Sequence, residues 1–137
     1  MTAAQLAPAI DGLRVSLHVL AASIWVGGQL TVAGLLPAVR RLGPEAPRRI
    51  ANAFARVSWP AYVVLLGTGV WNVTAATGHR SPAWNVVLGV KIAVVVLAGL
   101  AAWLHGRSKT KAALAAWGAV AGAASVSALV MGVFLAG

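Results

Sequence analysis

Apolar residues gather into four long stretches along the chain, at residues 13–37, 55–77, 84–105 and 113–136. Each stretch has the roughly 20 apolar residues that an α-helix needs to cross a hydrocarbon core about 30 Å thick. The polar connections RRLGPEAPRRI, GHRSP and HGRSKTK contain the glycine and proline residues that end helices. The pattern predicts an all-α integral membrane protein, an antiparallel four-helix bundle in which residues 1–137 form a single domain.

The composition excludes most classes of soluble protein. Hydrophobic residues make up 60% of the chain and charged residues 9%, whereas about a quarter of a soluble domain is charged. The absence of cysteine removes disulfides and thiolate metal sites from consideration. The net charge is +9, but the basic residues lie at the ends of the apolar stretches, where they meet lipid headgroups. We therefore expect a lipid bilayer, and not a nucleic acid, as the partner.

The basic residues are distributed unequally between the three connections. The second connection has only Arg80, whereas the first and third carry Arg40, Arg41, Arg48, Arg49, Arg56, Arg107, Lys109 and Lys111. The positive-inside rule then places the first and third connections in the cytoplasm and both termini outside it. The first stretch follows Asp11 instead of a basic segment and is longer than a signal-peptide core, so we expect it to be retained. The expected location is a bacterial inner (plasma) membrane.

Each apolar stretch holds one polar or soft side chain at a similar depth. All four lie about 7–11 Å from the predicted outer end of their span, and they are His18, Asn72, Lys91 and Met131. Polar groups within spans usually face the bundle interior or a water-filled cavity. The first stretch also carries a stripe at helical spacing, formed by Arg14, His18, Ala22, Trp25 and Gln29. Trp25 lies deep enough in this stripe to line a cavity.

His18 has three interpretations. In the first, His18 is a neutral histidine that is hydrogen-bonded to a neighbouring helix, for instance to Asn72. In the second, it is a ligand of a metal centre, since one imidazole suffices for an axial haem position. In the third, it is part of a proton relay. Lys91 either extends to the outer interface or, with Arg14, binds an anionic group such as a haem propionate. Met131 either fills space or supplies a thioether to haem or Cu(I). His79 and His105 lie in connections at opposite faces and cannot share a site.

Several of these residues stand in motifs that resemble those of a known membrane-protein family. The stretch LHVLAASIWVGG (residues 17–28), continuing to Leu36 and Pro37, resembles the helix bearing LHxxxxxxWxGG in the copper-resistance D (CopD) membrane family and the related HemJ-type protoporphyrinogen oxidases. The TG in LLGTGVW (Thr68, Gly69) and the lysine in LGVKIAVVVLAGLAAW look like the next two helices. The resemblance covers residues 13–105 and implies that His18 and Lys91 are functional. It implies haem b at this site in HemJ-like relatives and copper movement across the inner membrane in the CopD family.

Three functions remain as alternatives. The first is a haem-binding protein of membrane redox or electron transfer, with His18 as the ligand and with Lys91, Arg14, Trp25 and Asn72 around the cofactor. The second is a copper-handling membrane protein that uses His18 and Met131, and the third is a cofactor-free structural subunit. The sequence contains no Ser-His-Asp arrangement or phosphate loop, so we do not expect the chain to be an enzyme on its own. Its small size favours a homo-oligomer or a subunit of a larger membrane complex.

Overall fold

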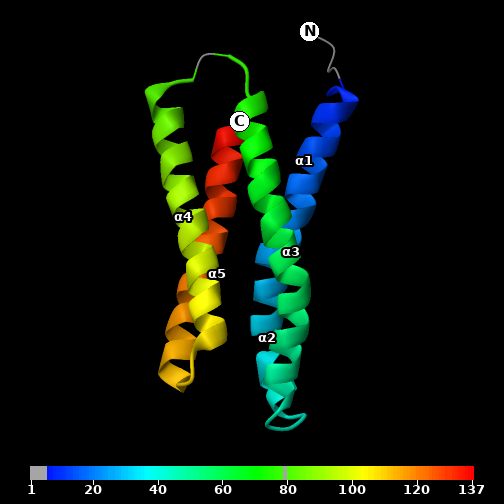
Figure 1. Cartoon of the computed structure of the whole chain (residues 1–137), viewed down its shortest axis with the longest axis vertical. Helices are drawn as coiled ribbons and strands as arrows, with labels where there is room; N and C mark the ends of the chain where they lie inside the picture. Colours follow the sequence, from blue (N-terminus) through cyan, green and yellow to red (C-terminus); the bar gives the residue numbers. More distant parts are fainter. Residues whose placement is uncertain (1–5, 79) are drawn as a thin grey trace. The chain divides into compact units, whose positions relative to one another are not determined.

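The computed structural model describes residues 6–78 and 80–137, which form helices joined by short turns (Figure 1). Four continuous helical rods are long and apolar enough to cross a membrane: Ala9–Arg40, Ala46–Ala75, Pro82–Arg107 and Lys111–Ala136. The first rod consists of α1 (Ala9–Ala22), a π-helical turn η1 (Ser23–Gly27) and α2 (Gly28–Arg40), and the others are α3 (Ala46–Ala75), α4 (Pro82–Arg107) and α5 (Lys111–Ala136). The described residues contain no strand. The prediction of an all-α fold with four spans is confirmed.

Two helices begin where side chains satisfy their first backbone N–H groups. Ser81 Oγ accepts a hydrogen bond from the backbone N–H of Trp84 at 3.1 Å, directly before α4. Thr110 Oγ1 accepts one from the backbone N–H of Ala113 at 3.1 Å, directly before α5. Hydroxyl groups at this position stabilise a helix start by about 1 kcal/mol. The short third connection is therefore a capped turn between two long helices.

The helix α3 begins earlier than the apolar pattern predicted. The apolar stretch begins at residue 55, whereas the helix begins at Ala46 and has Pro47 in its first turn, where proline is tolerated. The turn before it includes Gly43, whose φ of +124° is a conformation that favours glycine. Interpreting the whole of RRLGPEAPRRI as a turn was wrong, because an apolar pattern locates the part of a helix within lipid and not the whole helix.

The described residues divide into two compact units. Unit 1 comprises the chain up to Gly28 together with Leu36–Thr77, and unit 2 comprises Gln29–Leu35 with Gly78–Gly137. The single-domain organisation stays a prediction.

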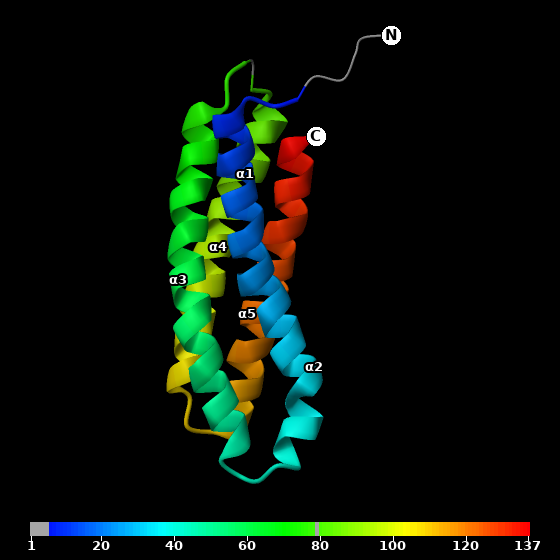
Figure 2. The ribbon, with the colours of Figure 1, turned by 90° about the vertical axis from the view of Figure 1, so that its right-hand side faces the viewer.

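Unit 1 is built around α1 and α3, which lie side by side and run in opposite directions in Figures 1 and 2. Its buried side chains include Ala21, Trp25, Ala61 and Thr68. Gly28 allows a close approach of the two rods, because a Cβ atom there would collide with the ring of Phe54.

Unit 2 is built around the antiparallel hairpin of α4 and α5 (Figure 1). The buried residues of these two helices are small, and they are Ala98, Gly99, Ala101, Ala121, Ala124, Ser125 and Ala128. Small side chains let helix backbones approach closely, which is how helices commonly associate in membranes. The segment of α2 in this unit adds one polar contact, since the Gln29 amide donates to Ser125 Oγ at 3.2 Å.

Many large apolar side chains remain on the surface of the helices. Val63 is 65% exposed, Val133 67% and Phe134 76%. Exposed apolar side chains on every rod would favour aggregation in water, whereas in a bilayer they contact the hydrocarbon chains of the lipids. The chain is therefore an integral membrane protein.

Candidate functional site

His18 of α1 forms a hydrogen bond to α3 within unit 1. Its Nδ1 lies 2.8 Å from Oγ1 of Thr68, which is 6% exposed. The hydroxyl of Thr68 donates to the backbone oxygen of Val64 at 2.7 Å. A carbonyl can only accept and a hydroxyl has one proton, so Thr68 Oγ1 must accept the bond from His18 Nδ1–H. This network assigns the tautomer in which Nε2 carries the lone pair.

The imidazole of His18 also lies close to the backbone of α3. Its Cε1 atom is 3.7 Å from the position that a Cβ atom at Gly69 would take. Thr68 and Gly69 are the two residues of the TG pair noted in the sequence. Thr68 therefore orients the ring, and Gly69 leaves room beside it.

Asn72 does not provide the hydrogen bond to His18 that the sequence suggested. It is half-buried on α3, one helical turn beyond Thr68. Both residues lie on one face of α3 because their spacing is four residues. The sequence identified the correct face of α3 but the wrong turn of the helix.

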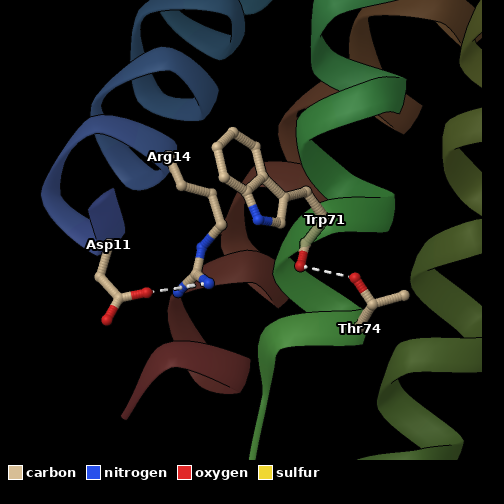
Figure 3. A network of polar contacts seen from close by, with 4 residues as sticks. All are labelled: Asp11, Arg14, Trp71 and Thr74. Carbon is tan, nitrogen blue, oxygen red and sulfur yellow. Dashed lines mark hydrogen bonds and ion pairs between the residues drawn. The ribbon is translucent and has the colours of Figure 1, made fainter.

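Arg14 lies one turn before His18 on α1 and faces α3 (Figure 3). Its Nη1 is 3.0 Å from Oδ1 of Asp11, and its side chain is only 14% exposed. Figure 3 also shows the Trp71 indole beside the Arg14 side chain. Within the part of the chain that the structure describes, the buried Nε of Arg14 has no hydrogen-bond partner. An unsatisfied buried N–H is costly, so this guanidinium is suited to a second anionic or acceptor group.

Trp25 is packed among aromatic side chains. It lies in the π-helical turn η1 and is 3% exposed. Its ring centroid is 4.5 Å from that of Tyr62 and 5.5 Å from that of Trp59, both on α3. The expectation that Trp25 lines a cavity finds no support on this side, because Trp59 and Tyr62 occupy the space there.

Lys91 and Met131 belong to unit 2. The hydrogen bonds Trp84 Nε1–H to Leu135 O and His105 Nδ1–H to Leu114 O connect the two helices of this unit.

The ammonium group of Lys91 lies against α5. Its Nζ is 2.9 Å from the position of a Cβ at Gly132, one turn beyond Ala128. Gly132 directly follows the half-buried Met131, so the Lys91 ammonium lies next to the turn of α5 that carries Met131. No ion pair of Lys91 occurs among residues 6–78 and 80–137. The interpretation that Lys91 reaches toward the outer interface stays a prediction.

The other candidate ligands are His105, Met131 and His79. No group of three or more His, Cys, Asp or Glu side chains could hold a metal ion in the described ranges. His105 is engaged in the α4–α5 turn through its bond of 2.8 Å to the backbone oxygen of Leu114. His79 lies outside the described residues.

Two cavities lie at the ends of helices, one in each unit. One of about 260 Å³ is lined by residues of the α2–α3 turn, which include Leu42, Pro44 and Arg49. One of about 210 Å³ lies at the end of the α4–α5 hairpin and is lined by Trp84, Val87 and Phe134, among others.

These features define a helical integral membrane protein whose first two rods are joined by a part-buried histidine–threonine hydrogen bond. No model of a known family, no curated protein and no solved structure matches the chain. The resemblance to the CopD and HemJ-type families stays a prediction.

Proposed function

We propose that this chain is a small CopD/HemJ-like membrane protein that binds haem b through His18 and takes part in membrane redox or electron transfer. The observation that carries the proposal is the hydrogen bond from His18 Nδ1–H to Thr68 Oγ1. Histidines that ligate metals commonly donate their other ring N–H to a fixed acceptor, which sets the tautomer and the ring orientation. Nε2 of His18 is then the ligating nitrogen.

A porphyrin fits the residues of unit 1 better than a bare copper ion does. Residues 6–28 and 36–77 contain one histidine, no cysteine and no methionine. A copper site needs several imidazole or sulfur ligands from the protein, whereas a porphyrin brings four nitrogen ligands of its own. A single well-oriented histidine therefore suits haem.

Arg14 is the residue of unit 1 that would bind the acidic edge of a haem. It lies one turn from His18, and its buried Nε lacks a hydrogen-bond partner among the described residues. A propionate would supply the missing acceptor, and a charge-assisted bond of this kind is among the stronger hydrogen bonds. Lys91 is proposed as a second cation for the propionates, and Trp25 and Asn72 as neighbours of the cofactor. When bound, haem b would supply one-electron chemistry, while Thr68 would hold the ring of its ligand.

The finer location is also part of this proposal. The clustering of arginines at the α2–α3 turn supports a cytoplasmic position for that turn, with both termini outside and the protein in a bacterial inner membrane. The exposed apolar faces of all four rods leave surface for a homo-oligomer or a larger membrane complex. Copper handling, with Met131 as an additional ligand, is the alternative to haem.

A cofactor-free structural role is favoured by one specific observation. The aromatic cluster of Trp25, Trp59 and Tyr62 fills the interior of unit 1 below His18. The hydrogen bond between His18 and Thr68 would then serve helix packing alone.

Reconstitution with haem distinguishes these functions. The purified protein in detergent should bind haem b with a histidine-type Soret band, and His18→Ala should abolish that band while far-UV circular dichroism stays helical. His105→Ala is the matched control, because this imidazole lies in the last turn of α4 in unit 2, and this variant should bind haem as the parent does. Arg14→Gln should weaken haem binding by about tenfold, the value of one charged hydrogen bond. Equal binding by His18→Ala and the parent refutes the proposal, and metal analysis after copper loading tests the alternative.

A further inference from the structure

The helix α3 is much longer than the membrane it would cross. Its 30 residues span about 45 Å at 1.5 Å per residue, whereas the hydrocarbon core is about 30 Å thick. Residues 57–75 carry no charge and cover about 28 Å of that length. Residues 46–56 therefore extend about 16 Å beyond the hydrocarbon, into the headgroup layer.

The extending part of α3 has one basic face. With about 100° of rotation per residue, Arg48, Arg49 and Arg56 fall within an arc of about 100°. All three side chains are exposed. We call these three residues the α3 basic face. Arg40 and Arg41, also exposed, lie at the adjoining end of α2.

The arginines of this region have no carboxylate partners in the described structure. The chain has two acidic residues, Asp11 and Glu45, and only Glu45 lies near this turn. The ion pair found among residues 6–78 and 80–137 joins Asp11 to Arg14. Five exposed cations next to one carboxylate leave a large uncompensated charge, which calls for anions from outside the chain.

We propose that the α3 basic face binds the phosphate groups of anionic phospholipids in the membrane that the protein spans. Guanidinium groups match phosphate oxygens with two parallel hydrogen bonds, which a single ammonium cannot do. Arg56 lies where the apolar segment ends, at the depth of lipid phosphates, and Arg48 and Arg49 lie about 10–12 Å further along α3, at the outer side of the headgroup layer. Apolar side chains flank it, with Ile50 41% exposed and Val57 55% exposed, as is typical of segments at the boundary between headgroups and acyl chains. This depth favours lipid over a nucleic acid or an acidic protein.

The turn between α4 and α5 offers a matched control within the same chain. It also carries basic residues, Lys109 and Lys111, both exposed. Its arginine, Arg107, is stacked over the ring of Trp103 at 4.5 Å from the centroid. This turn therefore lacks a row of exposed arginines on one helix face.

The test measures lipid retained by the purified full chain in a nonionic detergent. Native mass spectrometry should show bound dioleoylphosphatidylglycerol and no comparable retention of dioleoylphosphatidylcholine. The triple variant Arg48→Gln, Arg49→Gln, Arg56→Gln should bind phosphatidylglycerol about a hundredfold more weakly, from roughly fivefold for each basic residue. The same three positions changed to lysine should lose less than tenfold, and Lys109→Gln with Lys111→Gln should stay within about threefold of the parent. Circular dichroism checks that each variant remains helical.

Three results would overturn the proposal. Equal retention of phosphatidylcholine would show that no anion is recognised, and an unchanged affinity of the triple glutamine variant would place the lipid elsewhere. Complete displacement of the lipid by millimolar inorganic phosphate, or co-purified RNA that the triple glutamine variant loses, would assign the face to a soluble anion. None of these measurements depends on haem, so they stand apart from the test of His18.

Discussion

The hydrogen bond between His18 and Thr68 makes a prediction that can be worked through in energy. Replacing Thr68 by valine keeps the shape of the side chain and removes the oxygen that accepts the His18 Nδ1–H bond at 2.8 Å. The backbone oxygen of Val64 loses only an extra donor, because it lies inside a continuous helix. The change therefore tests one contact between α1 and α3.

The expected cost follows from the burial of the two groups. Thr68 is 6% exposed, so water does not readily replace the lost acceptor. A buried N–H without a partner costs about 1–3 kcal/mol, whereas hydrogen bonds between helices in membrane proteins average about 0.6 kcal/mol and reach about 1.7. We expect Thr68→Val to lower the free energy of unfolding by about 1–2 kcal/mol. The coupling to His18→Ala in a double-mutant cycle should be about 0.6–1.7 kcal/mol.

The assay is reversible unfolding in mixed detergent micelles, followed by circular dichroism as the fraction of dodecyl sulfate rises. Thr74→Val is the matched control, because the exposed Thr74 hydroxyl donates only to the Trp71 backbone oxygen of its own helix at 3.0 Å. This control should change stability by less than about 0.5 kcal/mol. Equal effects of the two valine substitutions, or a coupling energy near zero, would refute the assignment of Thr68 as the acceptor.

Two further predictions concern packing and topology. Gly28→Ala should lower the free energy of unfolding by about 1–3 kcal/mol, because the new Cβ would meet the Phe54 ring. Gly27→Ala should be neutral or slightly stabilising, because a Cβ at position 27 would have no neighbouring atom within 4 Å. Equal melting temperatures of the two variants would contradict the close approach of Gly28 to Phe54. The chain has no cysteine, so single cysteines can be introduced as labels. Leu42→Cys should react with a membrane-impermeant maleimide only after the cells are permeabilised, whereas Ser81→Cys should react with it in intact cells. The reverse pattern would invert the proposed orientation.

The spans could be predicted from the sequence because hydropathy is a property of each residue summed over a window. The start of α3 at Ala46 could not be found this way, since its first turns carry arginines and lie outside any apolar window. The ion pair between Asp11 and Arg14 could have been predicted, because residues three apart on a helix are neighbours. Thr68 appeared in the sequence only as part of a resemblance. To identify Thr68 instead of Asn72 as the partner of His18, one must know how far α1 is shifted along its axis relative to α3. This shift depends on the packing of both helices.

The π-helical turn Ser23–Gly27 changes the direction in which the first rod presents its later side chains. Such a turn acts as a one-residue insertion in an α-helix, so every residue after it is rotated by about 100°. In an uninterrupted α-helix His18 and Gln29 would be only about 20° apart, as the predicted stripe required. Instead, His18 bonds to Thr68 of α3 and Gln29 to Ser125 of α5. The one-residue insertion therefore lets one continuous helical rod direct His18 toward α3 within unit 1 and Gln29 toward α5 within unit 2.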